Sequence, residues 1–234
     1  MTDGIANPVP PHSFFNFIKS HLDPDNVIHI SRTDPIGDDR GLKGTYQYPT
    51  DDSFTNQMDI QQVDITARNT RLDITFTMPA VTDGWTPPNG FDHVSFNVYF
   101  DLPNKTGLSM LPKINATAPD GFQWDYTNVV YSGGNSLHST DNADTHLGKP
   151  VNGAADIQVD KENGTILFRY DAFYFGLKNW NGVKVYATTW DIDGIENIYR
   201  PLNRKAGPYH FGGRDGNEAP LIMDDIDVIV IPTD

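Results

Sequence analysis

The densest group of residues that could do chemistry lies in the segment DPIGDDRG, residues 34–41. Asp34, Asp38 and Asp39 fall within six positions of a turn that Pro35 and Gly37 impose. Hard cations such as Ca²⁺ bind several oxygens that converge from a tight loop, including backbone carbonyls that glycine leaves accessible. The segment lacks the ligand spacing of an EF-hand. Two interpretations stay open for it, a cation-binding loop or a pair of Asx turns on a solvated loop.

Aromatic residues near turns and strand ends form a second group. The flat face of an exposed Trp or Tyr suits a sugar ring, because C–H groups of the sugar can stack on the π surface. The alternative is that these large side chains fill the core. Trp85 is the strongest candidate for exposure, since it lies in the loop TDGWTPP, residues 82–88, which offers little room for burial. The candidate ligand-binding residues are Trp85, Trp124, Trp180, Trp190 and Tyr209.

A search for catalytic residues gives a negative result. The chain contains no G-x-S-x-G, P-loop, H-E-x-x-H or G-x-G-x-x-G motif. No spacing singles out a carboxylate pair for glycoside hydrolysis. His138 and His146 share a polar segment with Asp141 and Asp144, which indicates either a metal site or, in preference, a flexible surface loop. We therefore expect no catalytic residue and a protein that is not an enzyme.

Composition restricts the partners and the fold class. The 234 residues include 28 Asp but only 3 Glu, with 20 Gly, 17 Pro and no Cys. Asp, Gly and Pro favour turns, and this balance is typical of a turn-rich β protein. The net charge of −14 makes nucleic acid and anionic membranes unfavourable partners. No apolar run is long enough to span a bilayer, and the N-terminus shows no secretion signal.

Hydrophobic periodicity predicts strands over most of the chain. Residues 71–78 and 93–101 alternate apolar and polar side chains with period two, which indicates one buried face for each strand. Weaker strands are expected over 27–32, 58–67, 124–131, 155–160, 165–170, 183–190 and 226–232, and the sequence KENG, residues 161–164, predicts a hairpin connection. A short helix is expected over 13–22. These elements predict an N-terminal arm with a short helix, residues 1–26, and one antiparallel β-sandwich, residues 27–234.

Several ordered motifs carry a resemblance to a known family. They are DPIGDDRGLKGTYQYPT at 34–50, GFDHVSFNVYFD at 90–101, LP at 111–112 with NA at 115–116, WDY at 124–126, and a closing pattern of Arg200, FGG at 211–213, Asp215, Pro220 and Asp224. Together they resemble the glucodextranase C-terminal module, which is appended to glucodextranases, pullulanases and amylopullulanases. The likeness extends from about Val27 to Pro232. A tryptophan of the family after the 71–78 strand is matched only loosely by Trp85.

The resemblance implies a DOMON-like sandwich of the jelly-roll type, located outside the cell, in the periplasm or at the cell surface. It also implies a structural calcium ion in the 34–41 loop. The implied ligands are Asp34, Gly37, Asp38 and Asp39, with Asp59 or Asp224 closing the shell from another strand.

Three functions remain in competition at this stage. The first is a carbohydrate-binding or cell-envelope-associated accessory module, with exposed aromatic rings stacked on neutral glycan and a calcium-stabilised loop. The second is a structural interaction domain that docks on a partner hydrolase or a surface protein and does not bind sugar. The third and least favoured is a glycan hydrolase on a β-sandwich, which would need two facing carboxylates in a cleft.

Overall fold

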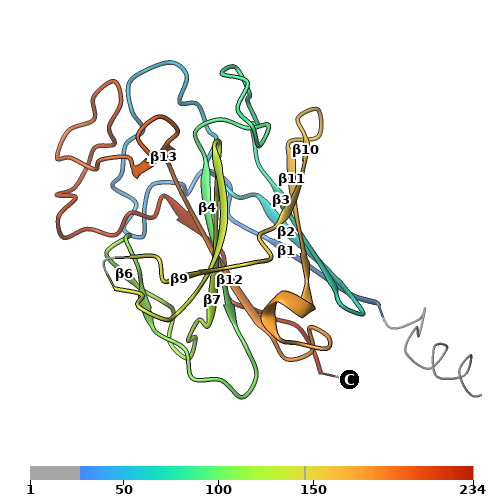
Figure 1. Cartoon of the computed structure of the whole chain (residues 1–234). Coiled ribbons are helices and arrows are strands. Elements are labelled where there is room, and N and C mark those ends of the chain that lie inside the picture. Colours follow the sequence, from blue (N-terminus) through green and yellow to red (C-terminus); the bar gives the residue numbers. More distant parts are fainter. Residues whose placement is uncertain (1–26, 145, 234) are drawn as a thin grey trace, which may run out of the picture.

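The computed structural model describes residues 27–144 and 146–233. The helix expected over 13–22 and the arm formed by residues 1–26 lie outside these residues. The regular elements of the described chain are almost all antiparallel strands, and most of them form two facing layers, which Figure 1 shows side by side. The predicted antiparallel β-sandwich is therefore confirmed.

The first layer is a five-stranded sheet in the order β1-β2-β3-β11-β10. Its strands are β1 Val27–Thr33, β2 Gln62–Arg68, β3 Arg71–Thr77, β10 Asp156–Asp160 and β11 Thr165–Asp171. Buried and partly exposed side chains alternate along β2, β3 and β11, as the period-two pattern predicts. The predicted hairpin at 161–164 connects β10 to β11, and Gly164 adopts the positive φ of 65° that this turn requires.

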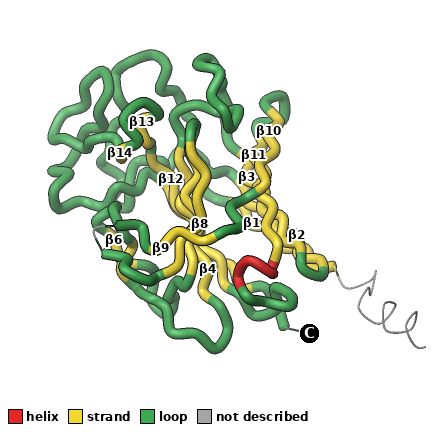
Figure 2. The backbone as a smooth tube through the Cα atoms, viewed as in Figure 1, coloured by secondary structure: helices red, strands yellow, loops and turns green. Residues whose placement is uncertain are grey.

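The second layer is a seven-stranded sheet in the order β15-β12-β4-β7-β8-β9, with β16 also paired to β12. Its strands are β4 Ser95–Asp101, β7 Tyr126–Tyr131, β8 Gly134–Ser139, β9 Lys149–Val151, β12 Lys184–Trp190, β15 Asp224–Asp225 and β16 Ile229–Val230. Two small ribbons, β5 Met110–Leu111 with β6 Ala116–Thr117 and β13 Ile192–Asp193 with β14 Ile198–Tyr199, lie outside both layers. The 3₁₀ helix η1, Ala172–Phe175, is the helical element of the described chain (Figure 2).

Aromatic side chains join the two layers. The Phe76 ring on β3 lies 4.9 Å from the Phe96 ring on β4, and the Phe168 ring on β11 lies 5.2 Å from Phe96. All three side chains are fully buried. Because these contacts cross from one sheet to the other, they stabilise the face-to-face packing of the sandwich.

β4 differs from the prediction of one buried face. Its residues are buried on both faces except for Asp101, because a second core cluster covers the outer side of this sheet. Tyr99, Trp124 and Tyr186 form part of that cluster. The strand also begins at Ser95 instead of residue 93, since His93 has a left-handed φ of 55° that a strand does not accommodate.

β8 and β9 were not among the predicted strands. The sequence GNSLHS of β8 is polar and shows little alternation, so the period-two pattern is lost there. The prediction of a flexible loop around His138 is wrong, because this residue lies in β8 and is buried.

Among the described residues, no helix has the length and apolar character needed to cross a membrane.

Candidate functional site

The side chains of Asp34, Asp38 and Asp224 meet in one group, which we call the acidic cluster. One carboxylate oxygen from each residue lies within 4.8 Å of the others. Asp224 is buried at the start of β15, and Oδ2 of Asp34 is buried with no hydrogen-bond partner in the described structure. A buried carboxylate oxygen without a partner is uncommon and points to an unfilled coordination or hydrogen-bonding role.

Main-chain hydrogen bonds hold the acidic cluster in place. Gly37 has a φ of 85°, which glycine adopts without strain, and its N–H donates to Oδ1 of Asp59 at 2.8 Å. The N–H of Ile60 donates to Oδ2 of Asp224 at 2.7 Å. The N–H of Asp225 donates to Oδ1 of Asp224 at 2.8 Å. The loop that carries Asp34 and Asp38 and the strand that carries Asp224 are thus both tied to the segment 59–60.

The electrostatics of the acidic cluster oppose its ionisation. Burial, and after it the repulsion of nearby carboxylates, raises the pKa of Asp34 to about 7. Burial likewise raises the pKa of Asp224 to about 8, and it raises the pKa of Asp38. A bound cation would favour the ionised forms and reverse these shifts. A donor set made of carboxylate oxygens suits a hard cation such as Ca²⁺.

Asp39 faces a different group from the other acids of its loop. The hydroxyl of Tyr48 donates to Oδ2 of Asp39, and Nη1 of Arg40 lies 3.4 Å from Oδ1. Asp39 therefore holds its loop against Tyr48 and does not join the acidic cluster. Of the sequence-predicted metal ligands, the structure brings together Asp34, Asp38 and Asp224, places Asp59 on the Gly37 N–H, and leaves Asp39 apart.

A cleft of about 610 Å³ opens elsewhere on the surface, and we call it the Trp85 cleft. Its walls are the loop at 85–88 and the segment 191–201, which contains β13 and β14. Trp85 and Tyr209 line it with side chains that are 61% and 54% exposed. The cleft therefore offers ligands two accessible aromatic faces.

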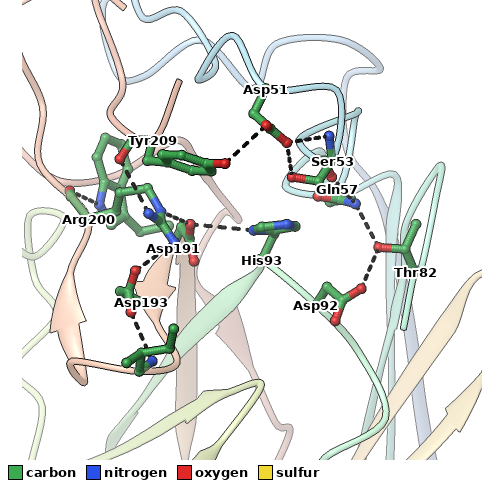
Figure 3. Close-up of polar contacts among 12 residues, drawn as sticks. Asp51, Ser53, Gln57, Thr82, Asp92, His93, Asp191, Asp193, Arg200 and Tyr209 are labelled. Carbon is green, nitrogen blue, oxygen red and sulfur yellow. Dashed lines mark hydrogen bonds and ion pairs between the residues drawn. The ribbon is translucent and has the colours of Figure 1, made fainter. Parts of the chain in front are cut away.

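A buried ion-pair network forms part of the floor of the Trp85 cleft. Nε of Arg200 donates to Oδ2 of Asp191, and Nη2 of Arg200 lies 3.3 Å from Oδ2 of Asp193. Nη1 of Arg200 donates to the carbonyl of Tyr209 at 3.3 Å. Figure 3 shows Asp191 between Arg200 and His93. Nδ1 of His93 lies 3.8 Å from Oδ2 of Asp191. Every nitrogen of the Arg200 guanidinium is thus engaged within the protein.

Asp92 and His93 complete this floor. The ring of His93 lies 3.9 Å from the ring of Phe54 and 5.7 Å from that of Trp85. Oδ2 of Asp92 lies 3.4 Å from the hydroxyl of Thr82, and Asp92 is 5% exposed. Neither residue is among the site residues predicted from the sequence. The sequence signal that contains them is the family-like motif GFDHVSFNVYFD at 90–101, and the structure adds that His93 has a left-handed backbone.

Three of the candidate tryptophans lie in the core. Trp124, Trp180 and Trp190 are each at most 1% exposed. Their indole N–H groups donate to the carbonyls of Met110, Thr70 and Arg200 at 2.8, 2.7 and 3.0 Å. This corrects the expectation that these rings face a ligand, since buried rings fill the sandwich and its outer cluster. Trp85 and Tyr209 remain as the accessible candidates.

His138 makes hydrogen bonds that account for its buried position. Its Nε2 lies 2.9 Å from the hydroxyl of Ser136, and its Nδ1 lies 3.3 Å from the carbonyl of Gly148. Burial lowers its pKa, which favours the neutral ring. We interpret it as a link between β8 and the segment that leads to β9.

An antiparallel β-sandwich with exposed aromatic rings on an open cleft has the form of a ligand-binding module. The sequence matches, over residues 30–233, the family model described as the C-terminal binding module, SLH-like, of glucodextranase. The chain therefore belongs to this family, as the resemblance of its motifs predicts. Comparison with curated proteins finds no matching sequence. Membership in a family of binding modules indicates a non-catalytic accessory domain.

Proposed function

We propose that this domain is a carbohydrate-binding module that attaches to neutral glycan through the Trp85 cleft. The observation that carries the proposal is the exposure of Trp85 and Tyr209, at 61% and 54%, on one cleft of a domain that belongs to a binding-module family. A sugar ring stacks on an aromatic face and its hydroxyls bond to the polar floor. The glycan is a polysaccharide or a cell-envelope polymer, and the domain acts outside the cell, in the periplasm or at the cell surface.

The proposed cation is a structural Ca²⁺ in the acidic cluster. Asp34, Asp38 and Asp224 would hold it, with Asp59 positioning Gly37 beside them. The buried, unpartnered Oδ2 of Asp34 and the raised pKa of Asp224 support this assignment. Bound Ca²⁺ would supply positive charge that neutralises the carboxylates and fixes the chain segments that carry them.

The test of glycan binding is a calorimetric titration with isomaltohexaose and maltohexaose, together with retention on insoluble polysaccharide and cell-envelope preparations. We expect dissociation constants of about 10⁻³ to 10⁻⁵ M for a few stacked rings. Trp85→Ala and Tyr209→Ala should each weaken binding about tenfold, since each removes one stacking surface. Phe173→Ala is the matched control, because Phe173 is 78% exposed and lies on η1, away from β13 in Figure 2.

A second candidate function is docking on a partner hydrolase or a surface protein. The observation that favours it is the exposure of Ile195 and Ile198, at 84% and 47%, on the same cleft. Exposed aliphatic side chains are typical of protein interfaces and contribute little to sugar binding. Absence of retention on every glycan, combined with an association that Ile195→Asp abolishes, would support docking in place of sugar binding.

A further inference from the structure

The floor of the Trp85 cleft is rich in carboxylates, which accept hydrogen bonds, and has few basic side chains. Asp92, Asp191, Asp193 and Glu196 all line the cleft. Among its described lining residues, Arg200 is the one Lys or Arg. Its three guanidinium nitrogens are already engaged with Asp191, Asp193 and the Tyr209 carbonyl. The protein therefore leaves no free cation there for an anionic ligand.

Asp92 is a buried carboxylate of this floor with unused capacity to accept hydrogen bonds. A carboxylate can accept about four hydrogen bonds. In the described structure the side chain of Asp92 receives one, from the hydroxyl of Thr82 at 3.4 Å. Nε2 of Gln57 donates to that hydroxyl at 2.7 Å, so a relay orients the carboxylate. Asp92 is 5% exposed, and a buried carboxylate without a cationic partner favours a ligand that donates hydrogen bonds.

His93 follows Asp92 in the chain, and its side chain is also buried and has unused hydrogen-bonding capacity. Its side chain is 7% exposed, and its Nε2 has no hydrogen-bond partner in the described part of the chain. Its φ of 55° places a non-glycine residue in the left-handed region, where backbone strain concentrates at functional sites. The N–H of Asp92 bonds to the Thr82 carbonyl at 2.6 Å, and the N–H of Val94 bonds to the Asp92 carbonyl at 2.6 Å. The pair is therefore held rigidly beneath Trp85.

We infer that Asp92 and His93 determine the specificity of the Trp85 cleft, and that they select a neutral sugar through its hydroxyl donors. This inference rests on the proposed function and deepens it. Asp92 accepts hydrogen bonds from adjacent hydroxyls of the sugar that stacks on Trp85, and His93 bonds to a further hydroxyl. Uronic acids are rejected, because their carboxylate meets an acidic floor with no free cation.

The first test uses the unaltered protein and four probes. Two probes are the neutral sugars isomaltohexaose and maltohexaose. The third is the O-methylated derivative of whichever of these two binds more tightly, and the fourth is hexagalacturonate. The methylated sugar keeps its ring and its oxygen acceptors but loses its donors. We expect at least tenfold weaker binding of the methylated sugar and no measurable binding of hexagalacturonate. Equal affinity for the methylated sugar, or tighter binding of hexagalacturonate, would overturn the inference.

The second test uses variants of matched shape. Asp92→Asn should weaken the binding of the neutral hexasaccharide at least tenfold. It should also reduce the ratio of the affinity for neutral sugar to the affinity for anionic sugar. His93→Asn keeps a residue that tolerates the left-handed backbone and should weaken binding several-fold. Asp120→Asn, an exposed carboxylate outside the cleft lining, is the control and should bind as the parent does.

The outcomes separate this inference from the proposed function. Loss of binding in Trp85→Ala, with unchanged affinity and selectivity in Asp92→Asn and His93→Asn, overturns the inference and leaves glycan binding intact. If the unaltered protein binds no neutral glycan, both fail. The measurements on methylated sugar decide the inference even if Asp92→Asn does not fold.

Discussion

The main-chain N–H of Ile60 donates to Oδ2 of Asp224 at 2.7 Å, and this bond joins the segment 51–60 to the acidic cluster. The same segment reaches the Trp85 cleft at its other end, where the hydroxyl of Tyr209 lies 3.3 Å from Oδ2 of Asp51. Between them, the hydroxyl of Thr189 on β12 donates to the Met58 carbonyl at 2.7 Å. One continuous stretch of chain therefore contacts both candidate sites.

Calcium should raise the melting temperature of the protein. A cation that binds the folded state at about 100 times its dissociation constant adds about 2.7 kcal/mol to the free energy of unfolding. For a domain of this size, that corresponds to an increase of roughly 5–10 °C. Differential scanning calorimetry with Ca²⁺ and with a chelator measures the shift. Equal melting temperatures in both conditions would remove the calcium proposal.

Stability in chelator should fall as the pH rises from about 4 to about 8. The pKa of Asp34 rises on folding from 3.8 to about 7, and that of Asp224 rises from 3.8 to about 8. The folded protein thus binds more protons than the unfolded chain across this window, so the free energy of unfolding decreases with increasing pH. Calcium should flatten this dependence, because it holds the carboxylates ionised. Melting curves at pH 5, 6, 7 and 8, with and without Ca²⁺, test both statements.

Asp34→Asn should stabilise the calcium-free protein and weaken its response to calcium. The substitution keeps the shape of the side chain but removes one charge from a repulsive cluster, so we expect a gain of about 1 kcal/mol in the free energy of unfolding at pH 8. The melting temperature in chelator should rise by roughly 2–4 °C. Asp52→Asn, an exposed acid outside the acidic cluster, is the control and should change neither value. A lower melting temperature for Asp34→Asn in chelator would contradict the repulsive role of this carboxylate.

The two proposed sites differ in how far the sequence predicts them. Asp34 and Asp38 are close in the chain, so their clustering was visible in the DPIGDDRG turn, and the family motifs added Asp224. The cleft floor brings His93 against Asp191, which pairs with Arg200, and His93 meets Asp191 only when β4 pairs with β12. No local pattern encodes such a contact. The DOMON-like jelly-roll assignment stays a prediction.

The sequence predicts the buried faces of the strands correctly, but it does not predict which tryptophans are exposed. Alternation along β3 gives the buried face directly, because one side of that strand faces the other sheet. Trp124 belongs instead to the second core cluster on the outer side of the other sheet. Whether a given aromatic ring is covered there depends on loops whose paths the sequence pattern does not specify.

Arg200→Ala should destabilise the domain much more than removal of an exposed arginine. Arg200 and Asp191 form an ion pair whose side chains are 9% and 1% exposed, so the substitution leaves a buried carboxylate without its cation. The expected loss is about 3–5 kcal/mol, or roughly 10 °C in melting temperature. Arg204→Ala is the matched control, since the Arg204 side chain is 85% exposed in its pair with Asp215. This substitution should lower the free energy of unfolding by about 0.5 kcal/mol or less. Similar losses in the two variants would contradict this ranking.

Acrylamide should quench the fluorescence of one tryptophan out of four. Trp85 is 61% exposed, whereas Trp124, Trp180 and Trp190 are at most 1% exposed, so a neutral quencher reaches Trp85 alone. Trp85→Phe should remove most of the quenchable signal, and Trp190→Phe should leave it unchanged. If glycan stacks on Trp85, then saturating isomaltohexaose or maltohexaose should reduce quenching in the parent and have no effect in Trp85→Phe. A quenchable fraction that survives in Trp85→Phe would place another ring at the surface, and unchanged quenching by a glycan that binds would exclude Trp85 as the stacking residue.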